Sequence, residues 1–247
     1  MIIVGDIGNT ETKFCLINNN KILKRFTLNT KTINYKILKK KFLFFKLNKI
    51  ILRKVLFCSV VPKTFNIIKN FFKKNYKIKS FELKELNLRK LIKIKVNYKQ
   101  IGSDRLANAI GIKKSKKNFI ILDFGTATTF DVLIDNTYHG GVIAPGLKLS
   151  LNTLINKASL IPHIDLKKTN KILGMNTINA VRSGFFWGYL GLIDNIINLI
   201  KKETKKSFKI IITGGFSNLF KNSIKTKVIL NKDITISGLI KASSLIK

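Results

Sequence analysis

Two short segments of the sequence combine an aspartate, a glycine and hydroxyl groups directly after an apolar run. They are DIGNT at residues 6–10 and DFGT at residues 123–126. Glycine lets the backbone approach a phosphate, Asn and Thr side chains donate hydrogen bonds, and an aspartate can hold Mg²⁺ or its water. A capped hairpin turn would use the same residue types. Their recurrence in one context favours a pair of phosphate-binding loops.

A third polar segment, GSDR at residues 102–105, could act on the acceptor of a transfer reaction. A carboxylate such as Asp104 can take the proton of an attacking hydroxyl, and the Arg105 guanidinium can bind an acidic substrate through two hydrogen bonds. The same residues suit an ordinary helix start, with Ser103 as N-cap and Asp104 in the first turn. For this tetrapeptide alone, the helix start is the simpler interpretation.

The composition makes the acidic residues informative. The 247 residues include 47 Lys and Arg against 12 Asp and Glu, a formal charge of +35, while 45% are hydrophobic, which excludes a disordered chain. Only five of the basic residues are Arg, the residue that nucleic-acid sites favour, so we interpret the excess Lys as solvated surface. An aspartate inside an apolar run, such as Asp6 or Asp123, is unfavourable without a function.

Cysteine and histidine usage excludes two further classes. Cys15 and Cys58 both lie in apolar runs, which predicts buried thiols in a reducing compartment rather than a disulfide scaffold. His139 and His163 are too few and too scattered for a zinc site. No apolar stretch is long enough to span a bilayer. We therefore expect a cytoplasmic protein.

Apolar periodicity predicts the elements that position these segments. Strands are predicted at 1–6, 14–17, 50–61, 119–123, 130–134 and 208–212, and helices at 64–74, 106–112, 147–160, 177–202 and from 237. The two aspartate loops share one strand–loop–strand setting, which indicates an internally duplicated α/β fold. The halves would be residues 1–113 and 114–247, divided at the polar run KKSKKN.

The predicted helix 177–202 carries Gly184, Gly188 and Gly191 on one face. Glycine inside a helix lowers its stability, so we expect another backbone to approach that face closely.

The motifs, taken in chain order, resemble those of the type III pantothenate kinases, a family of the acetate and sugar kinase, Hsp70 and actin superfamily. The matching segments are DIGNTETK (6–13), SVVP (59–62), GSDR (102–105), DFGTATTFDV (123–132), GGVIAPGL (140–147), the NT and SG of NTINAVRSG (176–184) and TGG (213–215). Ser103 stands where the family usually has Ala or Val. The ordered set covers nearly the whole chain.

The resemblance implies a duplicated ribonuclease H-like (actin-like ATPase) fold, with two mixed β-sheet halves, helices and an active site in the cleft between them. It implies ATP-dependent phosphorylation of pantothenate to 4′-phosphopantothenate, the first step of coenzyme A biosynthesis, by a homodimer with its site near the subunit interface. Two alternatives stay open: a kinase of the same fold acting on another small hydroxy acid, and a non-catalytic basic regulator that binds nucleic acid.

The resemblance also implies roles for individual residues. Asp104 would be the general base, Asp123 would hold a monovalent cation, K⁺ or NH₄⁺, and Asp6 would hold Mg²⁺ through ATP. The implied ATP-binding residues are Asp6, Ile7, Gly8, Asn9, Thr10, Glu11, Thr12, Lys13 and Thr126, with TGG near the adenine. The implied pantothenate-binding residues are Tyr98, Gly102, Ser103, Asp104, Arg105 and Thr177, the last from a neighbouring subunit.

Overall fold

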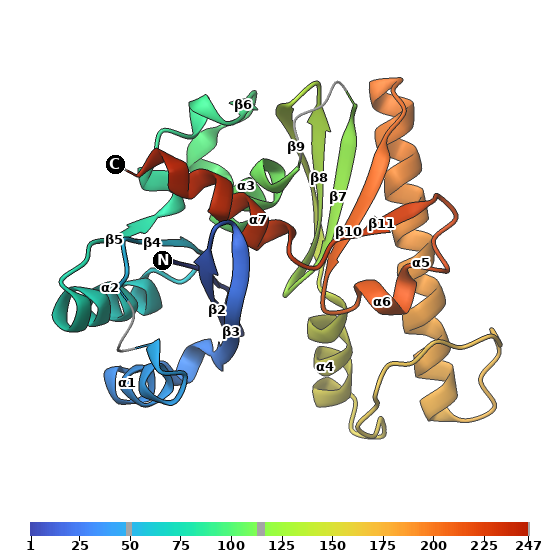
Figure 1. Cartoon of the computed structure of the whole chain (residues 1–247). Coiled ribbons are helices and arrows are strands. Elements are labelled where there is room, and N and C mark those ends of the chain that lie inside the picture. Colours follow the sequence, from blue (N-terminus) through green and yellow to red (C-terminus); the bar gives the residue numbers. More distant parts are fainter. Residues whose placement is uncertain (48–50, 113–116, 247) are drawn as a thin grey trace. The chain divides into compact units, whose positions relative to one another are not determined.

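In the computed structural model of the chain, residues 1–47, 51–112 and 117–246 are described (Figure 1). The chain divides into two compact units, residues 1–114 with 233–247, and residues 115–232. The predicted boundary between residues 113 and 114 lies outside the described residues. The C-terminal helix α7 (Ile234–Ala242) belongs to the first unit.

The first unit is built on a five-stranded sheet with the order β3-β2-β1-β4-β5. Its strands are β1 (Ile2–Ile7), β2 (Glu11–Asn18), β3 (Lys21–Asn29), β4 (Lys54–Ser59) and β5 (Ser80–Glu82). Strand β1 pairs with β2 antiparallel and with β4 parallel, and β4 pairs with β5 parallel. The carboxyl ends of β1, β4 and β5 therefore meet at one edge of the sheet.

Helices cover both faces of this sheet. The unit contains α1 (Tyr35–Phe44), α2 (Pro62–Tyr76), α3 (Ser103–Gly111), α7, the two-residue strand β6 (Lys93–Ile94) and 3₁₀ turns at Thr30–Thr32, Leu83–Glu85, Leu88–Lys90, Tyr98–Gln100 and Ser243–Leu245. Phe57 of β4 packs with Phe42 of α1 and Phe72 of α2 in one buried aromatic core. Because side chains alternate along a strand, Cys58 lies on the opposite face, toward α3 and α7.

The second unit repeats this arrangement. Its strands are β7 (Phe119–Phe124), β8 (Ala127–Ile134), β9 (Thr137–Pro145), β10 (Lys209–Gly214) and β11 (Val228–Leu230), and its helices are α4 (Leu147–Lys157), α5 (Thr177–Thr204) and α6 (Ser217–Phe220). Strand β7 pairs with β8 antiparallel and with β10 parallel, and β10 pairs with β11 parallel. Within this unit, the strand order β9-β8-β7-β10-β11 matches that of the first unit. The predicted duplication is confirmed.

Helix α5 packs through one face only. Phe186, Ile193 and Ile197 lie in the core of the second unit. A Cβ built on Gly184, Gly188 or Gly191 would meet no atom within 4 Å. The described part of this chain thus places no other backbone against the glycine face, because periodicity identifies a face but not what covers it. None of the described helices is long and apolar enough to cross a membrane.

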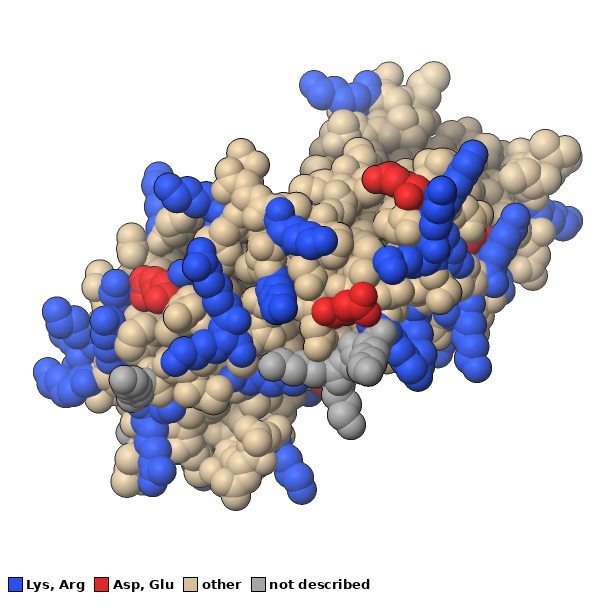
Figure 2. Space-filling view, turned by 90° about the horizontal axis from the view of Figure 1, so that it is seen from above, with Lys and Arg blue, Asp and Glu red and all other residues tan. Residues whose placement is uncertain are grey.

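Basic side chains are spread over the surface. In the face shown in Figure 2, Lys and Arg side chains are scattered with wide gaps between them, and acidic side chains are few and isolated. Arg25 and Asp233 form an ion pair at 2.9 Å, and both side chains are exposed. The excess positive charge thus faces solvent.

Helices α3 and α7 are in close contact within the first unit (Figure 1). A Cβ built on Gly238 would lie 1.8 Å from the carbonyl oxygen of Ala107, and one on Gly111 would lie 2.3 Å from that of Ile234. The Lys241 ammonium donates to the carbonyls of Ile110, Gly111 and Ile112 at 3.0, 2.8 and 2.7 Å, which caps the carboxyl end of α3. Helix α7 therefore fixes the position of α3.

We predict that Gly238→Ala destabilises the protein by about 2 kcal/mol or more, because the added methyl group would overlap the backbone of α3. Chemical denaturation would measure the change in the free energy of unfolding. Ser237→Ala on the same helix adds no atom and should change it by less than about 0.5 kcal/mol. Equal stability of the two variants would contradict the close packing of α3 against α7.

Candidate active site

Acidic residues of the first unit gather where β1, β4 and β5 end. Asp6 lies opposite Cys58 in the β1–β4 pairing, and Glu82 is the last residue of β5. The carboxylates of Asp6, Asp104 and Glu82 all act electrostatically on the Cys58 thiol. Ligands of open α/β sheets bind at the carboxyl ends of parallel strands, so this edge is the candidate site.

Thr30 forms hydrogen bonds with the loop between β1 and β2. The Gly8 amide donates to the Glu11 carbonyl at 3.0 Å, the Thr30 hydroxyl donates to the Gly8 carbonyl at 2.7 Å, and the Thr30 amide donates to the Thr10 carbonyl at 2.9 Å. The two bonds from Thr30 satisfy the carbonyls of Gly8 and Thr10 within the protein. The loop is thus shaped before any ligand binds.

The predicted ATP-binding residues of this loop fall into two groups. Asn9, Thr10, Glu11 and Lys13 are exposed, Asp6 and Gly8 are half-buried, and Ile7 and Thr12 are buried. The Thr12 and Thr30 hydroxyls share a hydrogen bond of 2.9 Å. The side chains of Ile7 and Thr12 therefore hold the loop in place, and only their backbones could face a nucleotide.

The Cys58 thiol contacts the Asp6 carboxylate. Its Sγ donates to Oδ1 of Asp6 at 3.4 Å and to the Gly5 carbonyl at 3.8 Å. Burial, with added repulsion from the carboxylates of Asp6 and Asp104, raises the pKa of this thiol well above its usual value. The thiol stays protonated and acts as a donor. Both cysteines are free and buried, which confirms that part of the sequence analysis.

The GSDR segment forms the start of α3, but its cap differs from the prediction. Gly102, not Ser103, is the N-cap residue, and it makes no side-chain cap. Ser103 instead donates its hydroxyl to Oε1 of Glu82, so the expected N-cap role of Ser103 is wrong. The Ser103 hydroxyl thus makes a tertiary hydrogen bond with Glu82 instead of capping its own helix.

Asp104 lies in the first turn of α3, as the sequence indicates. Its Oδ1 accepts the Arg105 amide at 2.9 Å. A Cβ on Gly102 would lie 2.5 Å from this same oxygen, so glycine at 102 leaves the space that the carboxylate occupies. The side chains of Asp104 and Arg105 are both half-buried.

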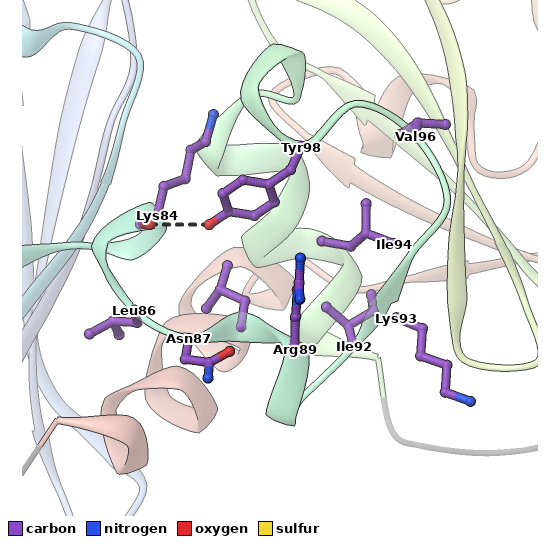
Figure 3. A pocket seen from close by; sticks show the side chains of 10 residues that line it. Lys84, Leu86, Asn87, Arg89, Ile92, Lys93, Ile94, Val96 and Tyr98 are labelled. Carbon is purple, nitrogen blue, oxygen red and sulfur yellow. Dashed lines mark hydrogen bonds between the residues drawn. The ribbon is translucent and has the colours of Figure 1, made fainter.

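Tyr98 lines a cavity of about 560 Å³ on the segment that leads to α3 (Figure 3). Its hydroxyl donates to the Lys84 carbonyl at 3.2 Å. Burial, together with the Glu82 carboxylate, raises the pKa of Tyr98. Lys84, Arg89 and Lys93 also line the cavity, and none of its described lining residues is acidic. The cavity would suit an anion, although the Tyr98 donor is already used.

The second unit has its own cluster of ligand-type residues, where β7 and β10 end. Asp123 lies opposite Thr213 in the β7–β10 pairing. Gly214 has φ of 85°, and a Cβ there would lie 2.7 Å from Oδ1 of Asp123. A Cβ on Gly146 would lie 1.9 Å from the Thr126 carbonyl oxygen. Gly146 and Gly214, in two different turns, thus leave space for the loop at residues 123–126. Thr126 of this loop is exposed.

Thr177 is the first residue of α5 and is exposed. The preceding Asn176 caps the helix through its side chain, which accepts the Asn179 amide at 2.9 Å. The structure therefore brings Asp6 and residues 102–105 together in the first unit, and Asp123, Thr126 and the TGG turn together in the second. Thr177 belongs to neither cluster.

Two buried or half-buried acids escaped the sequence analysis. Glu82 accepts from the Ser59 amide at 3.2 Å and from the Lys84 amide at 2.7 Å. Asp131 is fully buried and accepts the Tyr138 hydroxyl at 2.6 Å. The scarcity of carboxylates was the signal that could have found both, because Glu82 follows an apolar residue in a Lys-rich stretch and Asp131 lies within FDVLI.

The carboxylates of Asp6 and Asp123 suit cations that are also bound by a ligand. Across the described ranges, no group of three or more His, Cys, Asp or Glu residues could hold a metal ion by itself. Asp6 and Asp123 each offer carboxylate oxygens, the donors that Mg²⁺ and K⁺ accept. The space above Gly214 beside Oδ1 of Asp123 would be filled by a Cβ in any other residue. Both residues fit the implied ions.

Comparison with known proteins gives one consistent result. Residues 2–199 match the family model for type III pantothenate kinase. The chain is 75% identical, over the full length of both proteins, to a type III pantothenate kinase of Pelagibacter ubique (strain HTCC1062). It is 32% identical to that of Roseobacter denitrificans, with 97% of this chain and 96% of the relative covered.

The fold has solved counterparts. A structure described as a 2-dehydro-3-deoxygalactonokinase of Sinorhizobium meliloti superimposes with a TM-score of 0.64 at 10% identity, and covers 100% of this chain and 99% of its own. At such low identity the likeness concerns the fold alone. With the two repeated units, it confirms the predicted duplicated ribonuclease H-like fold.

Proposed function

The chain belongs to the type III pantothenate kinase family, and we propose that Asp104 is the base with which it phosphorylates pantothenate. The enzyme transfers the γ-phosphoryl group of ATP to pantothenate in coenzyme A biosynthesis. The observation that carries the proposal for Asp104 is its position: this half-buried carboxylate lies in the first turn of α3, and with Asp6 it acts electrostatically on Cys58 near the carboxyl ends of β1 and β4.

The proposed reaction is a direct in-line transfer. Oδ1 of Asp104 is held by the Arg105 amide, so Oδ2 is the atom that takes the proton from the primary hydroxyl of pantothenate. The hydroxyl oxygen attacks the γ-phosphorus of ATP. The bond between this phosphorus and the bridging oxygen of ADP breaks, and 4′-phosphopantothenate forms with no covalent enzyme intermediate. Arg105, Gly102 and Ser103 line the substrate pocket. Positioning and charge neutralisation supply most of the catalysis.

The nucleotide is bound by the two aspartate loops in this proposal. Asn9, Thr10, Lys13 and Thr126 would bind ATP, and the carboxylate of Asp6 would hold the Mg²⁺ that accompanies it. Bound Mg²⁺ would neutralise phosphate charge, and K⁺ or NH₄⁺ at Asp123 would add positive charge to the site. Tight glycine packing around both loops supports a backbone that approaches phosphates closely.

We also infer a homodimer in which Thr177 reaches the pantothenate pocket of the neighbouring subunit. Thr177 is exposed at the start of α5, and a Cβ built on Gly184, Gly188 or Gly191 of this helix would meet no atom within 4 Å in the described part of the chain. A second copy packed on this face would let two helix backbones approach closely. A cytoplasmic location fits two free, buried cysteines.

Replacing the base should abolish turnover but not nucleotide binding. We predict that Asp104→Asn lowers kcat at least about 10²-fold, because the amide cannot accept the proton. A coupled assay of ADP release with MgATP and pantothenate would measure kcat, and calorimetry would show ATP affinity close to that of the wild type. Asp135→Asn, at an exposed turn, is the matched control and should keep full activity. Normal turnover by Asp104→Asn would rule out this base.

The cation site at Asp123 makes a separate prediction. Pantothenate phosphorylation should depend on K⁺ or NH₄⁺ when Na⁺ keeps the ionic strength constant. Asp123→Asn should raise the K⁺ concentration for half-maximal turnover by about tenfold or more, since the amide carries no negative charge. Titrating K⁺ against the wild type and Asp135→Asn would measure this. Turnover independent of monovalent cations in the wild type would exclude the site.

Mixed dimers test the role of Thr177. If Thr177 serves the partner's site, Thr177→Ala and Asp104→Asn should both be weak enzymes alone. Their heterodimer would hold one intact site, with Asp104 from one subunit and Thr177 from the other. Co-refolding equal amounts should restore roughly a quarter of wild-type turnover, because half of the dimers carry one working site of two. Activity no higher than the mean of the two variants would place Thr177 elsewhere.

A further inference from the structure

Glu82 connects three elements that meet at the candidate site. It ends β5, and its Oε1 accepts both the Ser59 amide at the end of β4, at 3.2 Å, and the Ser103 hydroxyl at the start of α3. Its Oε2 accepts the Lys84 amide at 2.7 Å, within the turn that follows β5. One carboxylate thus joins the sheet edge to the helix that carries Asp104.

These bonds use both oxygens of the Glu82 side chain as acceptors. A carboxylate accepts at both oxygens, whereas an amide would place an N–H group toward one of these donors. All three donors are neutral groups, two backbone amides and one hydroxyl. Both oxygens of Glu82 thus accept hydrogen bonds, and the residue is half-buried at this position.

Ser103 is the residue through which α3 receives this support. It is buried, it directly precedes Asp104, and the N-cap residue Gly102 has no side chain to fix the first turn. The direction of that turn, and with it the position of the Asp104 carboxylate, depends on what Ser103 contacts. The hydroxyl of Ser103 binds Glu82 rather than the helix backbone.

We propose that Glu82 and Ser103 form a positioning pair that holds Asp104 in the geometry for proton transfer from pantothenate, a role that rests on the proposed function of Asp104 as base. Neither residue of the pair takes the proton. Losing the pair lets the first turn of α3 move, so the alignment of Asp104 with the attacking hydroxyl is lost. ATP binding, which involves other residues, is unaffected.

The test uses Ser103→Ala, Glu82→Gln and the double variant in the full-length enzyme. Ser103→Ala should lower kcat/KM for pantothenate about tenfold, with the KM for ATP within twofold of the wild type. Because the residues act as a pair, the double variant should be no worse than the weaker single variant. Ser80→Ala is the matched control, since its buried hydroxyl on β5 has no hydrogen-bond partner in the described part of the chain.

Hydrogen exchange supplies a readout that does not depend on turnover. The amides at the start of α3 should exchange faster in Ser103→Ala and Glu82→Gln than in the wild type and Ser80→Ala, while strands β1 and β4 stay protected. Unchanged exchange and additive losses in the double variant would overturn the pair. Absence of pantothenate turnover in the wild type would instead overturn the proposed function, and the exchange data would still decide whether the pair holds α3.

Discussion

Parallel pairing of β1 with β4 is the contact on which the candidate site depends. It sets Asp6 opposite Cys58 and brings the end of β4, with Ser59, to the same edge of the sheet. The parallel addition of β5 then carries Glu82 to that edge. Antiparallel pairing of β4 would place Ser59 at the far end, where it could not donate to Glu82. Sheet direction, rather than any single side chain, decides which polar groups can meet.

The second constraint is helix contact across a long stretch of sequence. Helix α3 carries Asp104, yet its position is fixed by α7, more than a hundred residues later, through the glycine contact at Gly238 and the Lys241 ammonium. A Cβ at position 238 would overlap the carbonyl oxygen of Ala107 in α3 and force the two helices apart. The helix that carries Asp104 is therefore held at both ends: Lys241 binds its carboxyl end, and Glu82 binds Ser103 at its amino end.

The sequence predicts the repeated strand–loop–strand units well, because an apolar run that stops at Asp and Gly is a strong local signal. It places the helices 64–74 and 177–202 within a few residues of α2 and α5. The sequence does not predict the tertiary contacts of these elements. Ser103 was expected to cap its own helix, and its actual partner, Glu82, lies in a Lys-rich stretch where periodicity is obscured. The uncovered glycine face of α5 shows the same limit, since a repeat of small residues does not say what packs on it.

The kind of donor around the site carboxylates explains how a chain with 47 basic residues can keep an acidic site. A Lys partner would neutralise a carboxylate and reduce its ability to accept a proton. Glu82 is held by two amides and a hydroxyl, and Oδ1 of Asp104 by an amide. Such neutral donors satisfy the oxygens without removing their charge. The Cys58 thiol, whose raised pKa keeps its proton, serves Asp6 in the same way. Abundant lysine at the surface is thus compatible with acidic groups at this edge of the sheet, because the donors to Glu82 and to Oδ1 of Asp104 are backbone amides and a hydroxyl.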